Sequence, residues 1–162
     1  MASLDMIQTL IEYDLAMTRR VWDSILAITD EQFVQEDPYS RGSIRNLMVH
    51  LASTDRRWLA GLKNEADVGH LAFQDYPARQ QAKDMFERVA TDLHEYVAGI
   101  TEAELEEKPA GMPATRADVL LHLVNHGTDH RATVLQRLYH LGASTFEQDF
   151  ITWLWSKERG ES

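Results

Sequence analysis

The chain has 162 residues, a formal net charge of −10, a hydrophobic fraction of 44% and no cysteine. That length matches one ordinary domain with enough apolar surface to form a core, so we expect residues 1–162 to fold as a single domain. The missing cysteines exclude disulfides, thiolate metal ligands and a cysteine nucleophile, and they fit a reducing, cytoplasmic location. The acidic balance disfavours binding to nucleic acid or to an anionic membrane, because both attract basic surfaces.

The N-terminal segment and the apolar runs indicate neither export nor membrane insertion. Ser3-Leu4-Asp5 leads straight into a helical pattern, without the basic segment and apolar core of a signal peptide. No apolar run approaches the roughly 20 residues that a membrane-spanning helix needs. The basic pairs Arg19-Arg20 and Arg56-Arg57 lie within helical patterns. We interpret them as solvated faces or local ion pairs and not as a phosphate-binding surface.

Apolar residues recur at helical spacing in four long segments. The predicted long helices cover residues 3–28, 43–62, 79–97 and 115–141. Short capped turns are expected after Thr29 and Thr101, and a last helical segment over 145–157. No stretch alternates with a period of two residues. The sequence therefore predicts an all-α fold, an antiparallel four-helix bundle with short extra helices.

Cap residues support these boundaries. Ser43 and Thr115 are predicted N-caps of the second and fourth long helices, and Gly142 is a predicted C-terminal stop. A weak internal repeat relates the two halves of the chain. When the first half is aligned with the second at a single constant offset in residue number, without gaps, Ser43 aligns with Thr115 and His50 with His122. We interpret the chain as two related helix pairs about a pseudo-two-fold axis.

Three of the seven histidines follow one another at intervals of four on the last long helix: His122, His126 and His130. Two histidines four residues apart lie on one helical face, which is a suitable separation for two ligands of one ion. On a helical wheel, His130 lies about 30° and His126 about 60–70° from the centre of the apolar stripe, whereas His122 lies more than about 100° away. His126 and His130 can therefore point inward, and His50, on the flank of the second helix's stripe, is the candidate third ligand.

Simpler interpretations stay open beside this one. A helical histidine is more often a surface or satisfied core residue than a ligand, and we give that role to three others: His70, His94 and His140. His122 remains a competing ligand, because the repeat pairs it with His50. Gly127 costs a helix about 1 kcal/mol relative to alanine. It would admit either a metal with its ligand or a close crossing by a neighbouring helix.

Three stretches of the sequence resemble the DinB family of DinB/YfiT-like metalloenzymes. They are LIEY leading into Trp22, SIRNLMVH continuing to Arg57-Trp58-Leu59, and LHLVNHGTDHR ending in Leu141-Gly142. The resemblance implies a four-helix bundle, often homodimeric, with a nickel- or zinc-type metal on His50, His126 and His130. The chain departs from common family patterns at two places: Asp129 stands where the patterns show His, and Ala132-Thr133 where they show Gly-Gln. The resemblance therefore does not define the substrate.

Three neutral imidazoles suit zinc, nickel or iron(II). Three protein ligands leave a coordination position open, as is typical of a catalytic site. A metal there would lower the pKa of a bound water toward about 7, or bind a substrate thiol as thiolate. We therefore predict a metal-dependent thiol S-transferase or hydrolase, with a low-molecular-weight thiol and a small-molecule electrophile as candidate substrates. The alternative is a non-catalytic, stress-related helical dimer whose metal is structural or absent.

The sequence leaves the catalytic acid and base unknown. Three carboxylates are candidate partners for the imidazole N–H groups: Asp14, Asp55 and Asp129. Asp129 is the weakest, because it neighbours His130 in sequence and so lies about 100° away on the helix. Aromatic residues near the C-terminus that we expect to be exposed are candidates for a homodimer surface: Phe150, Trp153 and Trp155.

Overall fold

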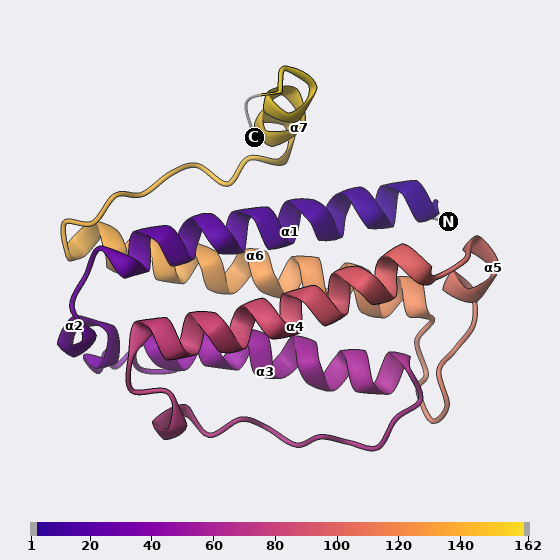
Figure 1. Cartoon of the computed structure of the whole chain (residues 1–162), viewed down its shortest axis with the longest axis horizontal. Helices are drawn as coiled ribbons and strands as arrows, with labels where there is room; N and C mark the ends of the chain where they lie inside the picture. The colour runs from indigo at the N-terminus through magenta and orange to yellow at the C-terminus, as the bar shows by residue number, and fades with distance from the viewer. Residues whose placement is uncertain (1–2, 161–162) are drawn as a thin grey trace.

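The computed structural model describes residues 3–160, which form a bundle of long helices with short helices at its ends and a last short helix beside the first long one (Figure 1). The long helices are α1 (Leu4–Leu26), α3 (Ile44–Leu62), α4 (Arg79–Gly99) and α6 (Arg116–His140). The shorter elements are α2 (Asp30–Val34), the 3-10 turn η1 (Phe73–Asp75), α5 (Glu102–Leu105) and α7 (Phe150–Glu158). Residues 3–160 contain no strand, so the predicted all-α, four-helix class is confirmed.

Two of the four packed pairs of long helices run in the same direction. Helix α1 packs against α4 and α6, and α3 also packs against α4 and α6. The pairs α1–α4 and α3–α6 are antiparallel, whereas α3–α4 and α1–α6 are parallel (Figure 1). The reason is the crossover, residues 63–77, which travels back along the bundle before α4 begins. Bundles with long crossovers depart from simple up-and-down alternation in this way.

Local capping explains where the helices begin and end. The side chain of Ser43 accepts a hydrogen bond from the Asn46 N–H at the start of α3, and Thr115 forms a capping box at the start of α6. Gly142, with a φ of 75°, follows α6 as expected of a C′ glycine. The last helix starts later than predicted, at Phe150, because the Asp149 side chain caps the first turn of α7.

The structure matches the predicted internal repeat element by element. The shift that places Ser43 on Thr115 also places the start of α2, at Asp30, on the start of α5, at Glu102. It likewise places the start of α3 on the start of α6. Each half therefore consists of a long helix, a short capped helix and a second long helix. The pseudo-equivalent helices α3 and α6 pack against each other and form an antiparallel seam.

Helix α7 is held to the bundle by aromatic packing on α1. Trp153 is buried and meets Tyr13 with ring centroids 5.6 Å apart, and half-buried Phe150 meets Tyr13 at 5.2 Å. The expectation that Trp153 is exposed is wrong, because Tyr13 provides an apolar partner on α1. Trp155 is exposed as expected, together with Ile151.

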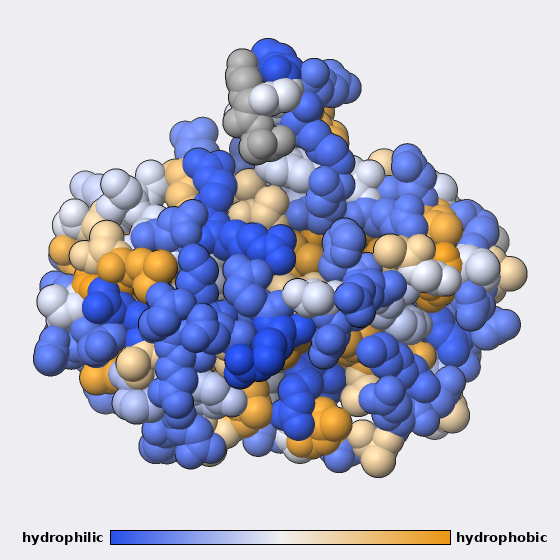
Figure 2. Space-filling model, viewed as in Figure 1, coloured by the Kyte–Doolittle hydropathy of each residue, from blue (hydrophilic) through white to orange (hydrophobic). Residues whose placement is uncertain are grey.

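The surface is predominantly hydrophilic, with apolar residues in small separate patches on the face shown in Figure 2. The basic pairs have local partners, as interpreted from the sequence. Arg19 pairs with Glu87, Arg20 lies over the Phe146 ring, Arg56 donates to the Val68 carbonyl and Arg57 pairs with Asp67. No helix within residues 3–160 is both long and apolar enough to cross a membrane.

Gly127 lies on the side of α6 that packs closely against α1. A Cβ atom added there would overlap Asp14 Oδ1 and lie 2.7 Å from Arg131 Nη1. The glycine therefore permits a close helix crossing around a buried ion pair. Of the two roles expected for Gly127, the structure supports the helix crossing.

Replacing Gly127 with Ala is expected to lower the free energy of unfolding by about 1–3 kcal/mol, because the new methyl group displaces a packed, charged neighbour. Gly99→Ala is the matched control, since a Cβ at this helical glycine meets nothing within 4 Å. It should be neutral or stabilise by up to about 1 kcal/mol. Urea unfolding of both variants measures the difference, and equal stability would contradict the close crossing.

Candidate metal centre

Three histidine side chains meet at the seam between α3 and α6. His50 comes from α3, and His126 and His130 come from successive turns of α6. The Nε2 atom of His126 lies 3.1 Å from Nε2 of His50 and 3.1 Å from Nε2 of His130. The ring planes are inclined to one another by 70° to 85°, so the nitrogen edges converge without the rings overlapping. The structure thus brings together all three residues predicted as ligands.

The two 3.1 Å separations from His126 Nε2 suit one shared cation, and all three candidate ligand atoms lie within 4.8 Å of one another. Metal–nitrogen bonds of about 2.0–2.1 Å place two ligand nitrogens about 3.0 Å apart at right-angle coordination and about 3.4 Å apart in a tetrahedron. The observed 3.1 Å lies between these values. An imidazole nitrogen offers one hydrogen or one lone pair, so His126 Nε2 cannot form good hydrogen bonds to both neighbours. A cation accepts a lone pair from each ring, and the three residues therefore fit a metal.

Burial keeps the three imidazoles neutral. Desolvation lowers the pKa of His50 to about 3 and that of His126 to about 4, and it also lowers the pKa of His130. The positive charge of Arg41, on the loop before α3, acts in the same direction on all three. Neutral imidazole is the form that binds metal. Protons therefore compete weakly for these nitrogens near neutral pH.

The same shifts predict that acid destabilises the metal-free protein. The unfolded chain binds protons at its histidines near the ordinary pKa of about 6.5, whereas the folded cluster binds them only at lower pH. The free energy of unfolding should be highest above about pH 7 and fall as the pH drops from about 6.5 toward 4. His50→Gln should lessen this fall, because it removes the most shifted imidazole.

Urea midpoints at about pH 7.5 and about pH 5 measure this dependence in metal-free protein. His94→Gln is the control, since His94 is exposed on α4. If wild type, His50→Gln and His94→Gln lose the same stability between the two pH values, the histidine cluster is not the cause.

The predicted carboxylate partners of the imidazoles are not found among the described residues. Asp14 pairs instead with Arg131, and Asp129 is exposed. Asp55 is buried, burial raises its pKa well above the ordinary value, and its carboxyl group makes no hydrogen bond within residues 3–160. The Nδ1 atoms of His126 and His130 are buried and also have no partner there. The imidazoles are therefore oriented by packing and not by a carboxylate.

Arg131 is the residue beside the candidate ligands that sequence reasoning missed. Its side chain is completely buried and donates to the Asp14 carboxylate, to the Asp14 carbonyl at 3.2 Å and to Thr18 Oγ1 at 3.1 Å. Its Nε donates to Gln148 Oε1 at 3.0 Å. Because Arg131 directly follows His130, this network fixes α6 against α1 next to the candidate ligand.

A signal for this pair was present in the sequence. Asp14 lies on the apolar stripe of α1, and Arg131 lies four residues after Gly127 on the stripe of α6. A charge on a buried stripe requires an opposite charge, so two such positions on different helices predict a pairing. The quoted DinB-like motif contains Arg131, but its spacing did not reveal this role.

The remaining histidines lie outside the cluster. His122 is exposed, as the helical wheel indicated, and stacks on His126 with ring centroids 5.7 Å apart. His70 contacts Ser53 and Arg57, and His94 and His140 are exposed. The structure thus gives these four residues surface or packing positions outside the convergent set.

Fold and site together define a class of protein, a helical bundle whose seam carries three convergent histidines suited to one divalent cation. The family profile of the DinB family matches residues 2–161, and the chain belongs to this family. It is 22% identical over 160 residues to Protein DinB of Bacillus subtilis (strain 168), covering 90% of this chain and 91% of that protein. The crystal structure of a DinB-like protein from Bacillus cereus ATCC 10987 has a TM-score of 0.72 at 18% identity. The match covers 90% of this chain and 97% of that one, and it shows the shared fold.

Proposed function

We propose that the protein binds one divalent metal ion through His50, His126 and His130 and acts as a metal-dependent enzyme of the thiol S-transferase or hydrolase type. The observation that carries the proposal is the convergence of three neutral imidazoles, with His126 Nε2 3.1 Å from Nε2 of each of the other two. This donor set favours zinc or nickel, with iron as a further candidate. Three protein ligands leave a position for a substrate or a water.

The chain's own contribution is to hold the nitrogens. Burial keeps the three imidazoles unprotonated, and the Asp14–Arg131 pair fixes the α6 backbone beside His130. When bound, the metal supplies Lewis acidity that favours a thiolate over a thiol or hydroxide over water. In thiol transfer, sulfur forms a bond to the electrophilic carbon, the leaving group departs with its electron pair, and the thiol proton passes to solvent. The proposed substrates are a low-molecular-weight thiol and a small-molecule electrophile.

Activity assays on protein purified without a histidine tag test the reaction type. The panel combines several biological thiols with 1-chloro-2,4-dinitrobenzene and, separately, with simple ester and amide substrates. Thiol-dependent turnover in wild type and its loss in His126→Ala support the transferase. Thiol-independent hydrolysis that requires His126 supports the hydrolase. Metal-loaded protein without either activity would overturn the enzyme proposal.

A non-catalytic, stress-related homodimer is the second candidate function. Two observations favour it: no acid or base is hydrogen-bonded to the histidine cluster within residues 3–160, and Trp155 and Ile151 are exposed on α7. Exposed aromatic and aliphatic residues are frequent in homodimer interfaces. We propose a cytoplasmic homodimer, which sedimentation tests. A species of 18.6 kDa at all concentrations would contradict dimerisation.

A further inference from the structure

The loop before α3 is bound to both helices of the histidine seam, and it carries Arg41. On α3, Asn46 lies one helical turn before His50, and its Nδ2 donates to the Arg41 carbonyl at 2.9 Å. On α6, Arg137 lies two turns after His130 and donates to two further carbonyls of the loop. The two helices that supply the candidate ligands therefore hold Arg41 beside the histidine cluster.

The backbone on both sides of Arg41 is held in a left-handed conformation. Ser40 has a φ of 57°, which a serine rarely adopts, and Gly42 has a φ of 90°. Such conformations persist where surrounding contacts fix them, and they are concentrated at functional sites. Here Asn46 and Arg137 supply those contacts. The loop thus fixes the Arg41 backbone at one place beside the cluster.

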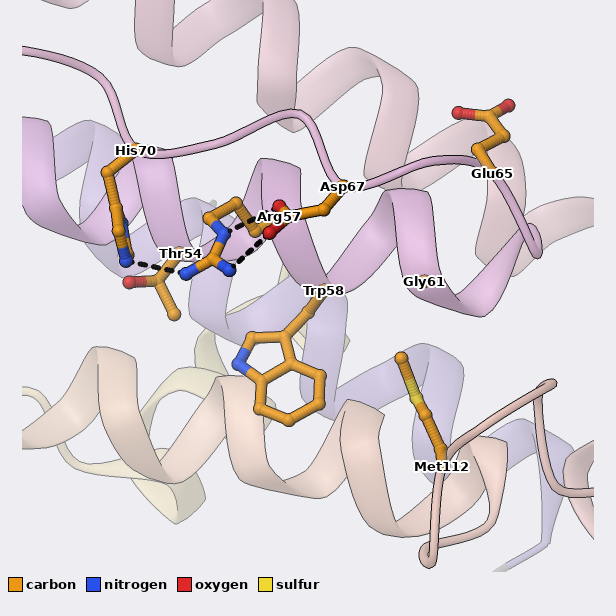
Figure 3. A pocket seen from close by; sticks show the side chains of 8 residues that line it. All are labelled: Thr54, Arg57, Trp58, Gly61, Glu65, Asp67, His70 and Met112. Atoms are coloured by element: carbon orange, nitrogen blue, oxygen red, sulfur yellow. Dashed lines mark hydrogen bonds and ion pairs between the residues drawn. The ribbon is translucent and has the colours of Figure 1, made fainter.

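The guanidinium of Arg41 has no partner among residues 3–160. It is exposed, and it forms no hydrogen bond or ion pair with that part of the chain. Three arginines of α3 and α6 are, by contrast, paired with carboxylates: Arg57 with Asp67 (Figure 3), Arg131 with Asp14 and Arg137 with Asp37. The loop therefore presents an unpaired positive charge beside the candidate ligands.

The charge of Arg41 acts on all three imidazoles. After burial, it is the strongest influence that lowers the pKa of His50, and it adds to the effect of burial in lowering the pKa of His126 and His130. The carboxylate of Asp129 acts in the opposite direction, on His126 and His130. These two exposed side chains therefore favour a negative group of a ligand at the His50 side of the cluster.

The cluster is reached from the solvent on the His126 side. His126 is half-buried, whereas His50 and His130 are each only 8% exposed. Arg41 is exposed as well, and its charge acts on the same nitrogens. One small molecule entering from this side can therefore contact both the histidine site and the guanidinium.

We propose that Arg41 determines substrate specificity by binding the carboxylate group of a small substrate whose reacting atom lies at the open position of the candidate metal centre. This inference rests on the proposed function and narrows its substrates to carboxylate-bearing compounds. A guanidinium presents parallel N–H donors that match the two oxygens of a carboxylate. The ligand thus supplies the negative charge that the described chain does not provide to Arg41.

Binding of two matched thiols to tag-free, Co²⁺-loaded protein tests the role of Arg41. The probes are 3-mercaptopropionate, which carries a carboxylate, and 3-mercaptopropionamide, which has an uncharged amide in its place. The near-ultraviolet absorption of a Co²⁺–thiolate bond reports the affinity of each. The preference for the carboxylate should fall about fivefold in Arg41→Gln, as expected for the loss of an exposed ion pair. Arg41→Lys should keep part of it, because lysine retains the charge without the paired donors.

Arg88→Gln is the matched control, because it removes an exposed arginine from α4 and changes the net charge equally. Both thiols are measured on each variant, so a change in folding or metal content cancels in their ratio. The same preference in wild type and Arg41→Gln, or an equal fall in Arg41→Gln and Arg88→Gln, would overturn the role of Arg41 and leave the metal function standing. Bound Co²⁺ that takes up neither thiol would overturn the inference but not metal binding. Failure of Co²⁺ to bind wild type would overturn the metal function and, with it, this inference.

Discussion

Replacing His126 with Ala is expected to reduce the bound divalent metal from about one equivalent to well under a tenth, with an affinity loss above the roughly 10- to 100-fold typical of outer-sphere partners. We expect the largest effect for His126 because its Nε2 lies 3.1 Å from the Nε2 atoms of both other candidate ligands. Without the His126 imidazole, only His50 and His130 remain of the three convergent side chains. Elemental analysis of tag-free protein measures the metal content.

His122→Ala is the matched control for this prediction. It lies one turn earlier on the same helix, is exposed and stacks on His126, yet it lies outside the convergent set. It should retain the metal and the rise in melting temperature that metal produces by binding the folded state. Full metal content in His126→Ala would refute the site. Equal loss in both variants would show that His122 is a ligand as well.

Asp14→Ala is expected to lower the free energy of unfolding by about 3–5 kcal/mol. The Arg131 side chain has no solvent exposure, and the variant would remove the carboxylate that is hydrogen-bonded to this buried positive charge. A domain of this kind has about 5–15 kcal/mol of stability in total. The loss is therefore a large fraction of what holds the bundle together.

Glu12→Ala provides the comparison for Asp14→Ala on the same helix. Its carboxylate pairs with Lys157, and the two side chains are 48% and 43% exposed. Exposed pairs contribute about 1 kcal/mol or less. Urea unfolding of the two variants should therefore separate them clearly, and Asp14→Ala with Arg131→Met should recover part of the loss, because the double variant removes the unpaired charge. Equal effects of Asp14→Ala and Glu12→Ala would show that the buried pair is not a major source of stability.

Much of the fold could be predicted from the sequence because it depends on local interactions. Helix caps and stops act on backbone groups only a few residues away, so they can be predicted without knowledge of the tertiary structure. Examples are the caps at Ser43 and Thr115 and the stop at Gly142. Inward orientation of His126 and His130 follows from helical geometry in the same way. Whether His50 meets them depends on how α3 and α6 are aligned along each other. A helical wheel describes one helix at a time and does not determine this alignment.

The features that sequence analysis missed depend on packing between distant segments. Trp153 is buried only because Tyr13, from the first helix of the chain, lies opposite it. The sequence makes Asp14 a candidate partner of the imidazoles, whereas in the structure it pairs with Arg131 on another helix. The parallel direction of α3 and α4 follows from the course of the crossover, which has no periodic pattern to indicate where it leads.

The helix pairing has a consequence for how the chain must fold. Both long helices of the first half, α1 and α3, find their main long-helix partners, α4 and α6, in the second half. Neither half buries its apolar stripes within itself, so neither has a core of its own. The bundle therefore forms by association of the two halves of the chain. Because the crossover links them covalently, each half meets the other at a high effective concentration. A half-length ancestor with this helix pairing would have required a second copy of itself in order to fold.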